Sequence, residues 1–242
     1  MRVDFAQYTP LECFDNIKCE QRGKHNVFVL ANGMNEPKEK RIIASKICRV
    51  IIESFMKRPS LKEVAFEKLV EMANSAVFAS QNPNFRIQCE YLMLCLCGNK
   101  AKWIRNGDVT LLHYANGELV SRTEREPHTV LGEELHVDAD IYETETLGKE
   151  DHYLIAFTGN LEEKLSVNAI TKHVRNAESA AGLQGMLLRQ YASNGGEDKV
   201  SMITLHLPPR KKSIWTILLL LLVAALVIFF VIGALGRMRP PM

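Results

Sequence analysis

Four consecutive strand-like segments in the middle of the chain constrain its fold most strongly. Each is rich in leucine, aromatic and β-branched residues, and short turn signals separate them, at Gly98-Asn99 and Asn116-Gly117. The segments span residues 88–97, 101–106, 109–114 and 118–122. Hairpin turns join neighbouring antiparallel strands, so this run predicts an antiparallel sheet and excludes a purely helical bundle.

Helical and strand patterns flank this central run on both sides. Before it, a buried type of strand at 27–30 ends at the turn signal Asn32-Gly33, and apolar residues then recur at helical spacing. After it, strands, helices and one last strand follow. The flanking elements are expected as helices at 38–56 and 61–77, strands at 137–146 and 152–157, helices at 163–175 and 178–192, and a strand at 200–207. The order predicts an α+β fold in layers, a sandwich of sheet and helices.

The small net charge of +2 conceals two different parts of the chain. Five of the 30 basic residues and none of the 28 acidic residues lie from position 210 onward, so residues 1–209 carry a net charge of −3. A protein that binds nucleic acid normally has a basic face on its folded part. We therefore expect no nucleic-acid partner.

An uncharged apolar run, from Ile214 to Gly236, lies near the C-terminus. As a helix it would span roughly 34 Å, and the hydrocarbon core of a bilayer is about 30 Å thick. This predicts a transmembrane helix at 214–236 that binds the chain to a membrane. The expected organisation is a domain at 1–207, a basic linker at 208–213, the helix, and a short tail at 237–242. Residues 1–209 are expected on the cytoplasmic side of a single-pass membrane protein.

The six cysteines lie mostly inside apolar runs, which suits a reducing compartment. Cys95 and Cys97 allow two interpretations. They are either part of a metal site or core residues of the strand Leu94-Cys95-Leu96-Cys97. No second cysteine pair at zinc-finger spacing accompanies them, which favours the strand core.

Four short motifs occur in order between residues 28 and 201. Residues 28–34 read FVLANGM, residues 106–108 read NGD, residues 151–159 read DHYLIAFTG, and residues 195–201 read GGEDKVS. In this order they resemble the FVVADGM, NVGDSR, D-x-LLL-C-SDG and G-x-x-DN-[IV]-[ST] motifs of the metal-dependent serine/threonine phosphatases of type 2C (PPM). The resemblance implies a β-sandwich flanked by helical pairs. It also implies two divalent cations, Mn or Mg, held mainly by aspartates, which activate a water for attack on a phosphoester.

The resemblance also implies that the metal site is degenerate in this chain. The aspartate that bridges both metals in the family is Asn32, which precedes Gly33, and a second aspartate falls on Thr158. The asparagine of the last motif is Lys199. A neutral amide or hydroxyl replaces an anionic oxygen ligand at two positions, and a cation enters at the third.

Two aspartates remain as residual metal ligands. Asp198 is the aspartate of the last motif, and Asp15 stands where the first metal-ligand aspartate of the family is expected. We therefore expect no catalytic residue and no cofactor. Mn or Mg would bind only if residual activity exists.

These substitutions favour a pseudophosphatase, a phosphatase-like protein without activity that serves as a binding or regulatory module in phospho-signalling. Its expected partner is a protein, either a kinase or a phosphoprotein. Lys199 then either contacts phosphate in place of the metals or is a solvated surface charge. One alternative is a divergent phosphatase with weak activity through a single metal at Asp15 and Asp198. Another is a membrane-tethered interaction module of separate lineage.

Overall fold

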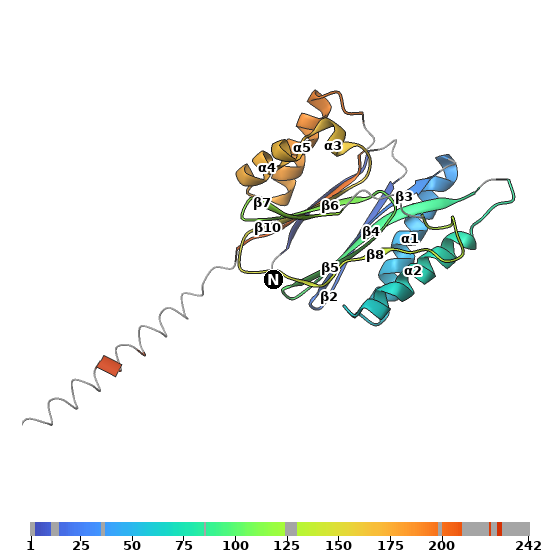
Figure 1. Cartoon of the computed structure of the whole chain (residues 1–242), viewed down its shortest axis with the longest axis horizontal. Coiled ribbons are helices and arrows are strands. Elements are labelled where there is room, and N and C mark those ends of the chain that lie inside the picture. Colours follow the sequence, from blue (N-terminus) through green and yellow to red (C-terminus); the bar gives the residue numbers. More distant parts are fainter. Residues whose placement is uncertain are drawn as a thin grey trace, which may run out of the picture. The chain divides into compact units, whose positions relative to one another are not determined.

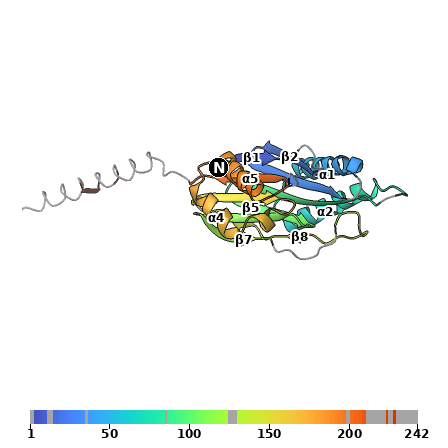
Figure 2. The ribbon, with the colours of Figure 1, turned by 90° about the horizontal axis from the view of Figure 1, so that it is seen from above.

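The computed structural model describes residues 3–10, 15–34, 37–84, 86–123, 130–197 and 200–209, together with Val223, Val227 and Ile228. The chain divides into two compact units, Met1–Pro208 and Pro209–Met242. All the strands and helices named below belong to the first unit, which Figures 1 and 2 show in two perpendicular views.

Two antiparallel sheets form the centre of this domain. The first has the strand order β1-β11-β10-β6-β7, and the second has the order β2-β3-β4-β5-β8, with β9 also paired to β5. The strands of the first sheet are β1 (Asp4–Tyr8), β6 (Thr110–Ala115), β7 (Glu118–Arg122), β10 (His152–Phe157) and β11 (Met202–Leu207). Those of the second are β2 (Asp15–Arg22), β3 (His25–Met34), β4 (Gln88–Cys97), β5 (Lys100–Asn106), β8 (Asp140–Ile141) and β9 (Glu145–Thr146).

Helices cover the outer faces of both sheets, so the domain has four layers (Figure 1). Helices α1 (Pro37–Lys57) and α2 (Glu63–Phe78) pack on the second sheet. On the first sheet lie α3 (Leu161–Lys164), α4 (Val167–Asn176) and α5 (Ala180–Ser193). Three apolar cores separate the layers, one under each set of helices and one between the sheets. The α+β layered sandwich expected from the sequence is confirmed.

Strand β4 shows why its own segment of the sequence is apolar at most positions. Its side chains alternate between two cores: Met93 and Cys95 face α1 and α2, whereas Leu94 and Leu96 face the other sheet. Cys95 is fully buried, and burial raises the pKa of its thiol to about 12. The strand-core interpretation of Cys95 is therefore confirmed.

The predicted hairpin turns have the backbone that their residues suggest. Asn116 and Gly117 both have positive φ, at 49° and 77°, between β6 and β7. Two consecutive residues of this kind are typical of the tight turn that matches the twist of a hairpin. Gly98 likewise has a φ of 63° between β4 and β5.

Several elements differ from the sequence prediction. Strands β1 and β2 had no apolar run to predict them, because both lie at sheet edges and expose much of their length.

The helix expected at 163–175 is two helices, α3 and α4. The second begins after Ser166, whose hydroxyl accepts a hydrogen bond from the N–H of Ala169. The strand expected at 137–146 is reduced to the short β8 and β9.

The membrane assignment requires correction. Residues 214–236 lie outside the described residues apart from Val223, Val227 and Ile228. In the part of the chain that the structure describes, no helix is long and apolar enough to cross a membrane. A spanning helix needs about 20 consecutive apolar residues, and no described helix provides them. The expected localisation as a single-pass membrane protein is not retained.

Candidate functional site

Three polar side chains lie side by side on adjacent strands of the second sheet. Asp15 of β2 is paired with Asn32 of β3, and Asn32 is paired in turn with Glu90 of β4. The antiparallel register thus brings together residues that are 17 and 58 positions apart in the chain. The row lies near the end of β3, where the strand leaves the apolar cores.

Glu90 accepts hydrogen bonds from two neighbours. The side-chain Nδ2 of Asn32 donates to Oε1 at 2.6 Å, and the backbone N–H of Asp108 donates to Oε2 at 2.8 Å. Glu90 is 6% exposed. Burial raises the pKa of this carboxyl above its usual 4.5, while the Asn32 amide and the Asp108 N–H act in the opposite direction.

The turn after β5 brings Asp108 to this carboxylate. Gly107 has a φ of 82°, and a Cβ at this position would lie only 2.3 Å from the Cβ of Glu90. Only glycine combines this backbone conformation with so close an approach. The preceding Asn106 is buried and holds the turn to a distant loop, because its Oδ1 accepts from the N–H of Leu131 at 2.9 Å.

Asp15 accepts a hydrogen bond from the other sheet. Thr158 follows β10, and its hydroxyl donates to Oδ2 of Asp15. The same hydroxyl accepts from the backbone N–H of Ser201 at 3.2 Å, and the Thr158 N–H donates to the Ser201 carbonyl at 3.0 Å. Asp15 and Thr158 are both buried. They therefore join the two sheets at the end of the sandwich where Asn32 and Glu90 lie.

A pocket of about 410 Å³ opens beside this network. Its lining combines four acidic residues with one lysine, Lys164. The lining residues are Asn32, Glu90, Asp108, Gly159, Asn160, Glu163, Lys164, Gly195 and Glu197. The excess of negative charge favours a cation over a phosphate group among these residues.

The structure brings together most of the site residues expected from the sequence. Asp15, Asn32 and Thr158 lie at one end of the sandwich, and Gly33 is buried opposite Cys89. Asp198 and Lys199 lie outside the described residues, so their roles stay predictions.

Sequence reasoning missed Glu90. The available signal was a single carboxylate inside the otherwise apolar strand segment at 88–97. A charged residue at such a position is almost never fully buried unless it has a partner. The sequence therefore offered a signal that Glu90 has a polar partner in the fold.

The described residues do not fit a pair of divalent cations. Asn32 and Thr158 are neutral, and each acts as a donor to a carboxylate of the chain itself. Among the described residues, no group of three or more histidine, cysteine, aspartate or glutamate side chains is placed to hold a metal ion. Hard cations need several anionic oxygens around them. The described donor set therefore disagrees with the binuclear site that the motif resemblance implies.

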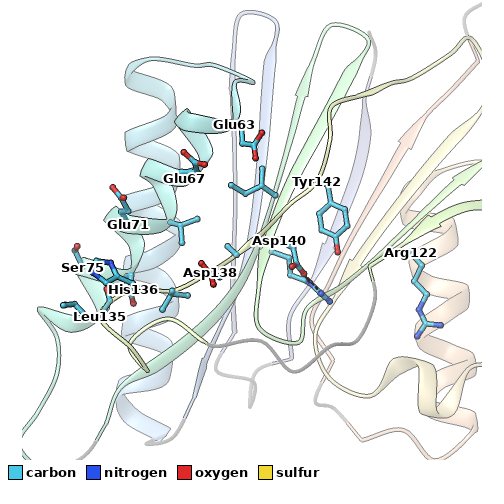
Figure 3. A pocket seen from close by; sticks show the side chains of 16 residues that line it. Glu63, Glu67, Glu71, Ser75, Arg122, Leu135, His136, Asp138, Asp140 and Tyr142 are labelled. Atoms are coloured by element: carbon cyan, nitrogen blue, oxygen red, sulfur yellow. Dashed lines mark hydrogen bonds and ion pairs between the residues drawn. The ribbon is translucent and has the colours of Figure 1, made fainter.

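A larger groove of about 1160 Å³ lies between α2 and the segment 135–142. Figure 3 shows Glu63, Glu67 and Glu71 along α2, with Asp138 and Asp140 on the facing segment. Asp140 forms an ion pair with the buried Arg105, with 2.5 Å between Oδ2 and Nη2. The groove shares no lining residue with the pocket beside Glu90.

The fold is that of known bacterial phosphatases. The S. agalactiae serine/threonine phosphatase superposes with a TM-score of 0.73 at 13% identity, over 86% of this chain and 99% of that one. The catalytic domain of the serine/threonine phosphatase PstP, in complex with two manganese ions, gives 0.70 at 14%, over 84% and 96%. PppA of Pseudomonas aeruginosa, a regulatory component of T6SS, gives 0.69 at 11%, over 84% and 96%.

At the level of sequence, no family model matches the chain, and a search of curated proteins finds no match. Identities of 11–14% establish the fold alone. The chain therefore has the fold of the type 2C (PPM) serine/threonine phosphatases, as its motifs imply.

Proposed function

We propose that this protein is a catalytically inactive member of the type 2C phosphatase fold, which acts as a binding or regulatory module in phospho-signalling. The observation that carries the proposal is the hydrogen bond from Asn32 to the buried Glu90. By the motif resemblance, Asn32 occupies the position of the aspartate that bridges both metals. Here it is a donor within the chain, a role that a metal-bridging carboxylate does not have.

The chemistry of the neighbouring position supports the same proposal. Thr158, at the second aspartate position of the motifs, donates its hydroxyl proton to Asp15. Each replacement removes one negative charge from the place where two doubly charged ions would sit. At such contact distances, each lost charge weakens cation binding by an amount on the order of several kcal/mol.

The charge of the pocket bears on what the module binds. Glu90, Asp108, Glu163 and Glu197 outnumber the lining cation Lys164. Without metal ions, this lining repels a phosphate group. We propose that the partner is a folded protein, a kinase or a phosphoprotein, that contacts the surface around the pocket.

Metal titration of the full chain tests the proposal. Isothermal calorimetry with Mn²⁺ and hydrolysis of an aryl phosphate are followed in parallel. We expect no binding at millimolar Mn²⁺ and no turnover. Turnover that disappears in Asp198→Ala would overturn the proposal and establish the divergent, weakly active phosphatase in its place.

A reversion series tests whether the neutral residues are the cause. The triple variant Asn32→Asp, Thr158→Asp, Lys199→Asn restores the residues of the family motifs, and we expect it to bind Mn²⁺. Asn26→Asp is the matched control, because it makes the same chemical change at the opposite end of the same strand. Metal binding by the control to the same extent would contradict the assignment of these positions.

A further inference from the structure

Two buried histidines face each other between the sheets. His113 of β6 and His152 of β10 are 4% and 6% exposed, and His113 Nε2 lies 3.2 Å from His152 Nδ1. Each is two positions from a residue of the inter-sheet core, Leu111 and Leu154, so both side chains project into that layer. His152 is the first residue of β10, whereas Thr158 follows the end of that strand, roughly 20 Å away. The proposed function does not involve them.

A carboxylate stands beside the outer nitrogen of each ring. Oε2 of Glu145 lies 2.9 Å from Nδ1 of His113, and Oε2 of Glu150 lies 3.6 Å from Nε2 of His152. These are charge contacts rather than aligned hydrogen bonds, because neither nitrogen has a hydrogen-bond partner. A bare lone pair at 2.9 Å from a carboxylate oxygen would be repelled, so Nδ1 of His113 carries a hydrogen.

This arrangement limits the number of protons that the pair can hold. The contact between the rings is a hydrogen bond only when one of the facing nitrogens carries a hydrogen and the other does not. The neutral pair and the pair with one added proton both satisfy this condition. A second added proton would set two N–H groups head to head and place two positive charges in contact within a buried layer.

The electrostatic surroundings of His152 agree with this limit. Burial lowers the pKa of His152 below its usual 6.5, and the neighbouring His113 lowers it further. Glu150, Asp151 and Glu145 act in the opposite direction on the same pKa. Adding a proton to His152 is therefore less favourable than adding one to a solvated histidine.

A metal ion is the other species that could lie between two imidazole nitrogens. Zinc takes four ligands in structural sites and three protein ligands in catalytic ones. Among the described parts of the chain, no group of three or more metal-binding side chains is placed to hold an ion. A proton is the occupant that the two nitrogens fit.

The segment that carries both carboxylates, residues 143–151, is held to the sandwich by short strand pairing, by hydrogen bonds and by the side chain of Leu147, which is buried in the inter-sheet core. Strand β9 contributes only two residues to the pairing with β5. The N–H of Leu147 donates to the carbonyl of Asn99 at 2.8 Å, and the N–H of Asn116 donates to the carbonyl of Asp151 at 2.8 Å. A change in the histidine pair is thus positioned to affect the attachment of this segment.

We propose that His113 and His152 form an acid-sensitive latch, in which uptake of a second proton separates the two rings and loosens residues 143–151 from the sandwich. The described charged groups that face the pair come from two places. Glu145 belongs to β9, and Glu150 and Asp151 precede β10. Asp151 is itself bound by His206 of β11, at 2.7 Å from Nε2 to Oδ1. Strands β5 and β7 contribute the uncharged Trp103 and Ser121.

Trp103 provides a direct reporter of the latch. Its ring lies edge-on to His113, with 6.3 Å between the ring centroids. The chain has two tryptophans, so the full-length Trp215→Phe variant leaves Trp103 as the only tryptophan, which can be excited selectively over the tyrosines. We expect its fluorescence to change between pH 7.5 and 5, in step with the ring NMR signals of His152. Amide hydrogen exchange in 143–151, corrected for the intrinsic rate, should rise over the same range.

Two variants separate the latch from general acid effects. His113→Gln keeps a polar atom near the position of Nε2 but cannot be charged, so we expect the pKa of His152 to rise toward 6.5. His136→Gln removes an exposed histidine in the groove beside α2 and should leave the pKa of His152 unchanged.

Several results would overturn the proposal. One is that neither Trp103 fluorescence nor amide hydrogen exchange in residues 143–151 changes with pH in the Trp215→Phe variant, in which both histidines are intact. Another is a His152 pKa that stays the same in His113→Gln. A change in Trp103 emission on adding EDTA or Zn²⁺ at constant pH would replace the proton by a metal ion.

Discussion

The side-chain amide of Asn32 donates a hydrogen bond of 2.6 Å to the buried carboxylate of Glu90. Two adjacent strands place the pair in register, and the backbone N–H of Asp108 binds the second oxygen of the same carboxylate. The contact suits a neutral residue at position 32. An aspartate there would face a second carboxylate at the same distance, unless a cation lay between them.

Asn32→Asp should therefore destabilise the protein in the absence of metal. Two carboxylates at this separation cannot both ionise readily, and we expect a loss of about 2 to 4 kcal/mol at pH 7. Thermal unfolding with and without Mn²⁺ measures the effect, and added Mn²⁺ should restore part of the loss. Asn26→Asp should show neither the loss nor the rescue. Equal stability of the two variants would contradict the role given to the Asn32–Glu90 contact.

Glu90 should make the protein less stable as the pH rises. Its pKa is raised in the folded state, so between the usual 4.5 and that raised value the folded state binds more protons than the unfolded state. The contribution of protonated Glu90 to the free energy of unfolding is then fully present below pH 4.5 and is lost as the pH rises through the raised pKa. Urea unfolding from pH 4.5 to 8 should show a smaller decline in Glu90→Gln than in the parent chain. The exposed Glu143→Gln serves as control and should leave the decline as it is.

Gly107→Ala should be more damaging than the same change at another left-handed glycine. The new methyl group would lie 2.3 Å from the Cβ of Glu90, in addition to the strain of a φ of 82°. We expect a loss of about 2 to 4 kcal/mol. Gly98→Ala has a similar φ, 63°, but open space around the methyl group, and should lose only about 1 kcal/mol. Equal losses in chemical denaturation would show that the contact with Glu90 is unimportant.

Thr158→Val tests the link between the two sheets. The substitution keeps the shape but removes the donor to Asp15 and the acceptor for the N–H of Ser201, and both partners are buried. The loss of these two hydrogen bonds should cost about 1 to 3 kcal/mol. Thr146→Val, at an exposed position of β9, should change the unfolding free energy by less than about 0.5 kcal/mol. A Thr158→Val protein as stable as this control would contradict the link.

The sequence predicted the interior of the fold better than its edges. Strands β3, β4, β6, β10 and β11 lie inside the sheets with apolar cores on both faces, so most of their residues are apolar. Strands β1 and β2 lie at edges, where one side of the backbone and half of the side chains face water, and their polar residues conceal them. Asn116 and Gly117 marked their turn because the required φ values restrict the residues that can occupy it.

For the candidate site, the motifs indicated Asp15, Asn32 and Thr158 but not Glu90. The motif resemblance compares positions with known ligands, and Glu90 lies outside every motif quoted for it. Its importance comes from its neighbours, Asn32 and Asp108, which are 58 and 18 positions away along the chain. The pairing of Asn32 with Glu90 depends on the register of β3 against β4, and because α1 and α2 lie between these strands in the chain, no hairpin turn fixes it.

The sequence by itself determined the layered α+β architecture, the hairpin turns and the presence of neutral residues at two motif positions, because burial periodicity, backbone conformation and charge are properties of local residues. Only the tertiary structure decided what the substituted residues do. It placed the Asn32 amide against Glu90, the Thr158 hydroxyl against Asp15, and His113 against His152. These contacts join strands that are far apart in the chain, and a hydrogen bond forms only where folding brings donor and acceptor within reach.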